Sequence, residues 1–316
     1  MKIEKKYWNF SEKKANLLKS RDAKPRALPF KKSRAAGCRK ESFFVRKFLG
    51  VMICFMLFMP FEPAVAEARL LTVQSSAAID TSVLAKGVVT VKYASKSGKK
   101  VKAGITKNKV TYYYDLPSNG TPAQLPLQMQ NGMYKVTVFE QTQGNSYKAV
   151  SSKDVPLNLK DQKTVFLQPV QNVNWTASMA PIKTAATLAK GKPKTEDKLK
   201  AIHQYVVRNV SYDYNKMKTV QSGYLPNINT VFTSKKGICY DYASLTAAML
   251  RSQEIPAKLV TGYSNKVQGY HAWNEVYIKE LNKWVTVDTT IDASLKNYSG
   301  KSIYKNTKDY KKINEY

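Results

Sequence analysis

Hydrophobic and polar residues alternate in short segments over residues 70–170. Segments rich in Val, Tyr and Thr are separated by turns that contain Gly, Asn or Pro. The clearest of these segments are 88–93, 101–105, 110–114 and 134–139. Strands of this length and spacing predict a small antiparallel β-sandwich or barrel. Because the region contains neither His nor Cys, we expect a spacer or binding module rather than a catalytic one.

A helical period replaces the alternation in the second half of the chain. Apolar residues recur at helical spacing after Thr195, which precedes two acidic residues. This pattern predicts an amphipathic helix over 196–209 with Thr195 as its N-cap. His203 lies within that helix, where an isolated histidine is usually a surface or packing residue. A second helix is expected to begin close to Cys239 and to end before Pro256.

Residues 1–66 have the pattern of a signal peptide with a long basic n-region. They contain 16 Lys and Arg against 5 Asp and Glu, and the apolar run 48–59 is followed by overlapping small-x-small patterns at 64–68. The run is short for a membrane span, so cleavage is the better interpretation and an uncleaved anchor is the alternative. We therefore expect a mature chain that is secreted or held at the cell wall, with no stable membrane span.

Charge and composition narrow the expected partners. The net charge of +30 falls to +19 once residues 1–66 are removed, and the remaining Lys residues are spread singly along the chain. This distribution lacks the clustered Arg of a nucleic-acid module, so no nucleic-acid partner is expected. A solvated basic surface is the simpler interpretation, and attraction to an anionic cell-wall polymer is the functional one. With two His residues and no evident acidic calcium-binding loop, neither a metal nor another cofactor is expected.

Cys239 is the one cysteine that remains after removal of residues 1–66. A single thiol in an exported protein is a buried inert residue, an intermolecular bridge or a nucleophile. Its predicted place at a helix N-terminus favours the nucleophile, because unpaired backbone N–H groups and the helix dipole stabilise a thiolate there. Gly237, two residues earlier, would let the backbone approach a substrate closely.

His271 and Asp288 lie on two alternating segments, 271–278 and 283–288, which predict a β-hairpin. If 279–282 form a four-residue loop, Asp288 falls one diagonal step from His271 on the same face. A two-residue turn would instead put Asp288 too far away. In the first register, a cysteine, a histidine and an aspartate can act as nucleophile, general base and orienting group for the imidazole.

Three motifs in this order resemble the transglutaminase-like superfamily. They are Gly-Ile-Cys at 237–239, His-Ala-Trp at 271–273, and the segment 284–290 that ends in Asp-Thr-Thr. The resemblance covers roughly residues 195–292. It implies a papain-like fold for this part of the chain.

The resemblance assigns Cys239, His271 and Asp288 to the catalytic triad positions of the family. The backbone N–H of Cys239 is one candidate oxyanion donor. The second donor is not assigned: Tyr212 is a weak candidate and is expected to be a packing residue. Family members of this bacterial type often have an aromatic residue shortly after the Asp motif, whereas this chain has Ile and Asp at 291–292.

The sequence thus predicts an α+β protein with a signal peptide at 1–66, a β-sandwich domain at 67–175 and a transglutaminase-like catalytic domain at 176–316. The predicted function is that of an exported cysteine enzyme acting on amide bonds of protein or peptide substrates. Water as acyl acceptor would give a peptidase or amidase, and a lysine amine would give a cross-linking transglutaminase. The alternative is a non-catalytic cell-wall or surface binding protein with a relict triad.

Overall fold

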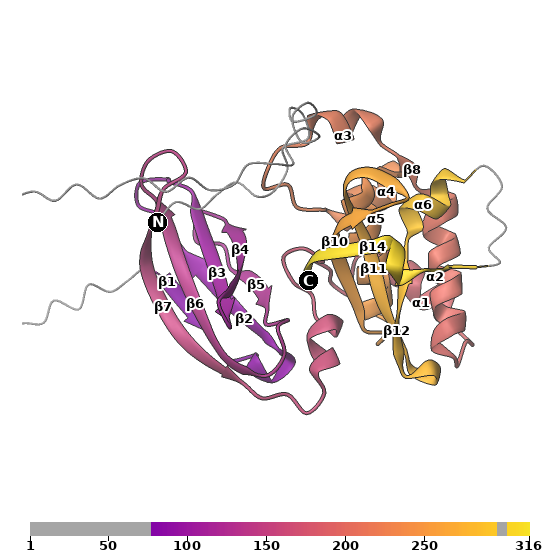
Figure 1. Cartoon of the computed structure of the whole chain (residues 1–316), viewed down its shortest axis with the longest axis horizontal. Coiled ribbons are helices and arrows are strands. Elements are labelled where there is room, and N and C mark those ends of the chain that lie inside the picture. The colour runs from indigo at the N-terminus through magenta and orange to yellow at the C-terminus, as the bar shows by residue number, and fades with distance from the viewer. Residues whose placement is uncertain (1–76, 296–301) are drawn as a thin grey trace, which may run out of the picture. The chain divides into compact units, whose positions relative to one another are not determined.

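Two antiparallel sheets form the N-terminal part of the chain (Figure 1). The computed structural model describes residues 77–295 and 302–316, so the predicted signal peptide at 1–66 lies outside the described residues. The first sheet has the order β1 (Ala77–Asp80), β2 (Val88–Tyr93), β5 (Ala123–Pro126). The second has the order β4 (Val110–Leu116), β3 (Val101–Lys107), β6 (Gly132–Gln141), β7 (Tyr147–Leu157).

Alternate side chains of both sheets meet in one apolar core. Val91 and Leu125 of the first sheet and Ile105, Tyr134 and Val136 of the second are fully buried in it. Alternation buries every second residue of a strand against the facing sheet. The predicted antiparallel β-sandwich is therefore confirmed. Short 3-10 turns, Leu84–Lys86 and Gln162–Leu167, interrupt and follow the strands.

A five-stranded antiparallel sheet with helices makes up the C-terminal part. Its order is β13 (Tyr304–Lys305), β12 (Lys283–Val287), β11 (Val267–Ile278), β10 (Ala257–Ser264), β14 (Tyr310–Glu315). The helices are α1 (Ala180–Ala189), α2 (Thr195–Asn209), α3 (Tyr214–Thr219), α4 (Ile228–Ser234), α5 (Cys239–Arg251) and α6 (Thr289–Ser294). Helix α5 packs on β10 and β11 and is covered in turn by α1 and α2. The α+β class is confirmed.

The hairpin β11–β12 has the register that the sequence predicts for a four-residue loop. Ile278 pairs with Lys283, and the pairing continues to Asn274 opposite Val287. A 3-10 turn, Lys279–Leu281, and one left-handed residue, Asn282, close the loop. Asp288 follows β12 directly.

Two short strands bring a distant segment beside the start of α5. Strand β8 (Ser211–Tyr212) pairs in parallel with β9 (Lys236–Gly237), and Tyr212 lies opposite Gly237. A Cβ at Gly237 would lie 2.7 Å from Cβ of Asp241, so only glycine fits this approach without a shift.

The start of α2 differs from the sequence prediction. Thr195 is the first helical residue and not the N-cap, which is Lys194. The N–H of Thr195 donates to Oε1 of Glu280 at 2.7 Å, so a carboxylate 85 residues away satisfies this helix start. The capping pattern around Thr195 is local, whereas the observed partner comes from tertiary packing.

Side-chain contacts join the sandwich to the five-stranded sheet. Gln128 Nε2 donates to the carbonyl of Glu315 at 3.2 Å, and the rings of Tyr114 and Tyr316 meet edge to face at 6.0 Å. All described residues belong to one compact unit. The boundary predicted near residue 175 stays a prediction. Among the described residues, no helix is both long and apolar enough to cross a membrane.

Candidate active site

Cys239 is the first residue of α5, as the sequence predicts, and 6% of it is exposed. The preceding Ile238 is the N-cap in extended conformation, and its N–H donates to Oδ2 of Asp241 at 2.9 Å. A side chain at the third helical position that binds the N-cap N–H fixes how the chain enters a helix. The turn that presents the thiol is therefore held by a buried carboxylate.

The same carboxylate also anchors the segment that follows Tyr212. Asp241 is fully buried and accepts from Nζ of Lys216 at 2.6 Å and from the hydroxyl of Tyr224 at 2.5 Å. A buried carboxylate with several donors is fixed in place, because moving it would strand each partner. The sequence analysis did not identify Asp241, although its position three residues after the N-cap is a usable signal.

His271 and Asp288 meet as the hairpin register requires. Nε2 of His271 lies 2.7 Å from Oδ2 of Asp288, and both side chains are buried. Asp288 is the N-cap of α6, where its Oδ1 accepts the N–H groups of Thr290 and Ile291 at 3.1 and 3.0 Å. One oxygen thus binds the helix start and the other orients the imidazole, a division that holds the ring in one position.

Cys239 is the other group that interacts with the imidazole of His271. Since Nε2 contacts Asp288, Nδ1 is the ring nitrogen that remains for the thiol. Burial lowers the pKa of His271, but the hydrogen bonds and charges of Asp288 and Cys239 outweigh it and raise the pKa to about 10. The imidazolium form therefore persists at neutral pH beside the thiol. The structure brings together all three residues predicted for the triad.

Tyr310 is a further contact of Asp288 that the sequence analysis missed. Its hydroxyl donates to Oδ2 of Asp288 at 3.1 Å, and its ring packs on Trp273 with centroids 5.0 Å apart. Tyr310 begins β14, which lies beside β10 and beyond the motifs of the sequence. Only that strand pairing reveals the contact, so no local signal could have predicted it.

We expect Tyr310→Phe to lower kcat for any reaction that uses His271 by about three- to tenfold, with KM unchanged. The substitution keeps the ring packing but removes one hydrogen bond to the charged group that orients the imidazole. Steady-state kinetics and thermal unfolding of the purified variant test this. Tyr263→Phe, on an exposed tyrosine of β10, is the matched control. Equal kcat values in Tyr310→Phe and the control would contradict the assigned role.

Tyr212 lies close to Cys239. Its hydroxyl is close to the backbone N–H of Cys239. Burial raises the pKa of Tyr212, so the hydroxyl keeps its proton and can donate. A hydroxyl donor next to a nucleophile can stabilise a tetrahedral oxyanion, and this role for Tyr212 stays a prediction. The pairing of β8 with β9 brings it there.

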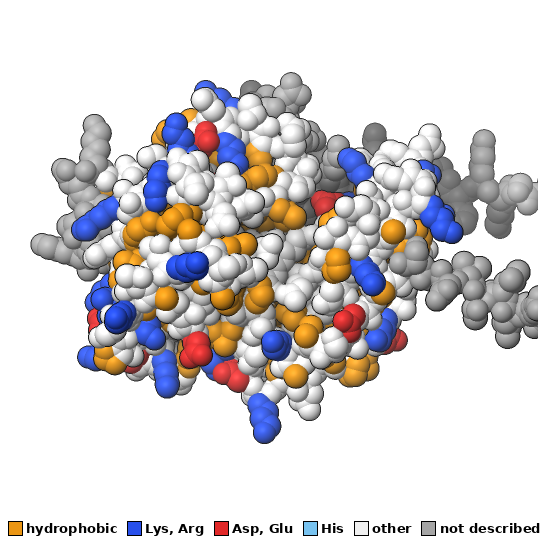
Figure 2. All heavy atoms as spheres, turned by 180° about the vertical axis from the view of Figure 1, so that it is seen from behind, with side chains coloured by type: hydrophobic (Ala, Val, Ile, Leu, Met, Phe, Trp, Pro, Cys, Tyr) orange, Lys and Arg blue, Asp and Glu red, His pale blue; other side chains and the backbone are white. Residues whose placement is uncertain are grey.

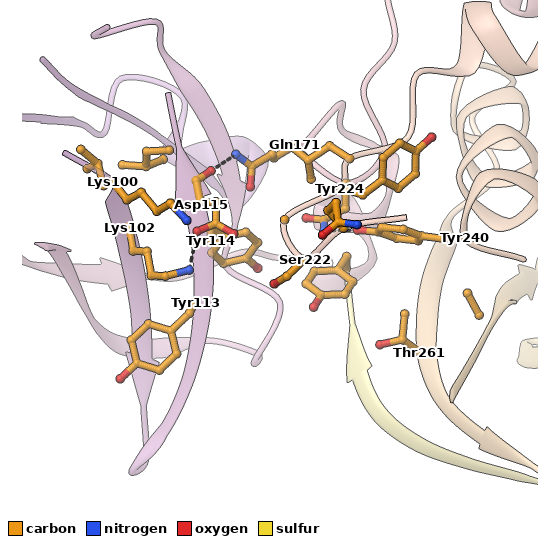
Figure 3. Close-up of a pocket in the computed structure, with 18 of the residues that line it drawn as sticks. Lys100, Lys102, Tyr113, Tyr114, Asp115, Gln171, Ser222, Tyr224, Tyr240 and Thr261 are labelled. Carbon is orange, nitrogen blue, oxygen red and sulfur yellow. Dashed lines mark hydrogen bonds and ion pairs between the residues drawn. The ribbon is translucent and has the colours of Figure 1, made fainter. Parts of the chain in front are cut away.

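Cys239 and His271 lie in the wall of an open cleft of about 690 Å³. Residues of α5 and β10, such as Tyr240 and Thr261, line the side that carries the thiol. The facing side comes from the four-stranded sheet and includes Lys100, Lys102 and Asp115 (Figure 3). The β-sandwich, expected to be a spacer or binding module, therefore contributes directly to the cleft.

The other histidine and the departure from the family pattern are explained together. Nε2 of His203 lies 2.9 Å from Oδ2 of Asp292, and both side chains are fully buried. Nζ of Lys305 contacts the other oxygen of Asp292 at 2.5 Å. His203 is thus a packing residue, as expected, and the aspartate at 292 is its partner. None of these three residues lines the cleft.

The two tryptophans of the hairpin lie in different surroundings. Trp273 is 2% exposed and stacks on the ring of His271 with centroids 6.2 Å apart. Trp284 packs on Phe166 of the sandwich region with centroids 5.6 Å apart. Neither lines the cleft, so both are packing residues. In the part of the chain that the structure describes, no group of three His, Cys, Asp or Glu side chains could hold a metal ion.

Comparison with known proteins adds a family match. Residues 182–289 match the sequence profile described as "Transglutaminase-like superfamily". A UPF0252 protein of Methanocaldococcus jannaschii is 33% identical over 129 residues, which cover 37% of this chain and 36% of the relative. The chain thus spans about a third of the length of that relative.

Two solved structures share a distant likeness. A proposed cysteine protease from Cytophaga hutchinsonii is 20% identical with a TM-score of 0.36, covering 64% of this chain and 74% of its own. Red sea bream transglutaminase is 12% identical with a TM-score of 0.29, covering 64% of this chain and 48% of its own.

Proposed function

We propose that this chain is a cysteine enzyme that cleaves amide bonds in peptide or protein substrates. The match of residues 182–289 to the transglutaminase-like superfamily supports this proposal. One observation carries the proposal. His271 is hydrogen-bonded to Asp288, interacts with Cys239, and lies with Cys239 in the wall of an open cleft. A nucleophile, a base and an orienting carboxylate in this relation are the parts of acyl-transfer catalysis.

The proposed reaction has two steps. The sulfur of Cys239 attacks the amide carbonyl, and the tetrahedral oxyanion is stabilised by the Cys239 N–H and the Tyr212 hydroxyl. As the C–N bond breaks, the His271 imidazolium gives its proton to the leaving amine, and a thioester remains. Water then attacks the thioester with His271 as base, which releases the carboxylic acid and restores the thiol.

The charges around the cleft favour water as acyl acceptor over a lysine amine. Among the described residues that line it, Asp115 is the one acidic side chain, and it is already paired with Lys102. Lys100, Lys102 and the His271 imidazolium are positive there. A lysine ammonium would be repelled by these groups and would find no carboxylate to hold it. Hydrolysis is therefore the proposed outcome.

A pool of Gln-containing and Lys-containing peptides, incubated with the full chain and analysed by mass spectrometry, tests this function. Hydrolysis of a peptide bond gives two fragments whose masses sum to that of the peptide plus one water, and hydrolysis of a side-chain amide converts Gln to Glu. Cross-linking instead joins two peptides with loss of ammonia. The matched control is Cys239→Ala. We expect hydrolysis that disappears in the control. Cross-linked products would contradict the choice of acceptor, and no change in any peptide mass would favour the non-catalytic alternative.

The pKa of His271 predicts the alkaline limit of activity. The imidazolium is the proton donor for the leaving amine, so kcat/KM is expected to fall as pH rises through about 10. The same raised pKa stabilises the folded chain fully below about pH 6.5, and this contribution is lost as pH rises toward 10. A pH–rate profile, with circular dichroism at each pH, tests this. A loss of activity already complete near neutral pH in folded protein would contradict it.

Export and attachment to an anionic cell-wall polymer remain part of the proposal. The signal-peptide pattern of residues 1–66 supports export. Figure 2 shows Lys and Arg side chains scattered over the visible face with few acidic neighbours. A surface of this kind attracts polyanions over a range set by salt. Attachment of the full chain to cell-wall material should therefore weaken as salt is added.

A further inference from the structure

We propose that the exposed edge of β4, with Lys100 beside it, is a subsite that binds an extended, acidic stretch of the peptide substrate. The inference rests on the proposed function and adds to it the chemical class of the substrate. Three features of the cleft carry it: an unpaired strand edge, a hydrogen-bonded link from that edge to the nucleophile, and the charge of the wall.

Strand β4 is the first strand of its sheet and pairs with β3 alone among the described strands. The carbonyl of Asp115 accepts from Nε2 of Gln171 at 2.5 Å, so this residue turns its backbone away from β3 (Figure 3). Backbone groups of a strand alternate in direction, so Tyr113 and Thr111 turn theirs to the same open side. Apart from the carbonyl of Asp115, which Gln171 occupies, these backbone groups have no partner among the described residues. Such a row is a template for another extended chain.

Two hydrogen bonds connect this edge to the nucleophile. Gln171 binds Asp115 of β4, and the next residue, Asn172, donates from Nδ2 to the hydroxyl of Tyr240 at 2.6 Å. Tyr240 directly follows Cys239 in α5. The main chain of Asn172 is itself held, because its carbonyl accepts from Ser244 of α5 at 2.9 Å. These hydrogen bonds thus link the strand edge to the residue next to the thiol, across the cleft.

The wall beside the edge is positively charged. Lys102 is paired with Asp115, whereas the exposed Lys100 has no ion-pair partner among the described residues. No other acidic side chain of the described cleft lining offsets that charge. A carboxylate on the substrate would supply the missing partner, and a cationic side chain would be repelled. Charge complementarity therefore selects an acidic peptide.

An added strand explains how the subsite would bind. A peptide that pairs with a sheet edge gains affinity from main-chain hydrogen bonds, and its alternate side chains give specificity. The backbone of Tyr113 would bind the peptide main chain, and Lys100 would bind an acidic side chain beside it. A second copy of this chain is the competing occupant. Edge-to-edge pairing would bring the same lysines of two copies close together, which opposes it.

Binding to the full chain carrying Cys239→Ala tests the subsite without turnover. The probe is a fluorescein-labelled ten-residue peptide with a central Gln flanked by Glu, compared with the same peptide carrying Lys in place of Glu. Adding Lys100→Glu should lower the affinity for the acidic peptide by about tenfold and raise the affinity for the basic peptide. Lys160→Glu, an exposed lysine that does not line the cleft, is the matched control and should change neither. Equal affinities of the acidic peptide in the two charge variants would overturn the proposal.

The proposed main-chain hydrogen bonds between the peptide and the β4 edge are tested separately. Methylating the backbone nitrogens at alternate positions of the acidic peptide should weaken binding by about five- to tenfold for one alternate set and little for the other. Equal effects of the two sets would overturn strand addition. A dimer in solution that the peptide does not dissociate would assign the edge to a second copy and would also overturn it. If the acidic peptide binds as expected but the chain that retains Cys239 does not cleave it, the proposed function alone has failed.

Discussion

Replacing Cys239 with alanine is expected to abolish amide hydrolysis, by about 10⁴-fold or more, while the fold is preserved. The reaction depends on a covalent bond to the thiol, and alanine leaves no group that could replace it. The side chain is small and 94% buried, so its loss removes one sulfur from the packing and should lower the melting temperature by only a few degrees. Peptide hydrolysis followed by mass spectrometry, with a thermal unfolding curve for each protein, measures both effects.

Cys239→Ser is the matched control, because it keeps the size of the side chain and a hydrogen bond to His271. It should also lose most of the activity, since a hydroxyl is a much weaker nucleophile than a thiol. Residual activity of Cys239→Ala near that of the unmodified chain would show that another group performs the chemistry. Unfolding of both variants would indicate a structural cysteine.

His271→Ala is expected to lower kcat by about 10³- to 10⁴-fold and to slow alkylation of Cys239 at the same time. Both effects have one cause, because the imidazolium supplies the leaving-group proton and the positive charge beside the thiol. Asp288→Asn should be milder or comparable, because it acts through the orientation of the ring. Kinetics and alkylation rates on the same preparations measure the coupling.

His203 provides the contrast for this prediction. It is paired with Asp292 as His271 is paired with Asp288, but it does not line the cleft. His203→Ala should therefore lower stability, because it leaves a buried carboxylate without one of its partners, while kcat per folded molecule stays unchanged. A large loss of kcat in folded His203→Ala together with a silent His271→Ala would contradict the assignment.

Much of the site could be predicted because its determinants are local. The four-residue loop after Ile278 fixes the hairpin register, and that register alone places Asp288 on the face of His271. Likewise, the change from a glycine-containing loop to an apolar stripe locates the start of α5 at Cys239. Turn length and hydrophobic period are properties of adjacent residues, so a single sequence contains them.

The contacts that the sequence did not predict all join segments far apart in the chain. Tyr310 reaches Asp288 only because β14 pairs with β10, and Asn172 reaches Tyr240 only because the segment that follows the sandwich lies against α5. Glu280 satisfies the start of α2 in place of the expected cap for the same reason. Local patterns contain no information on such partners, and the wall of the cleft that β4 forms belongs to this class.

The rate of alkylation of Cys239 by iodoacetamide tests the central claim most directly. Peptide mapping identifies the alkylated residue. The alkylation rate is compared between the chain with its natural sequence and His271→Ala from about pH 5 to 9. The imidazolium beside the thiol predicts a rate below pH 7 that exceeds that of free cysteine and falls at least about tenfold in His271→Ala. Modification of Cys239 only after denaturation, at the same rate in both proteins, would contradict the account.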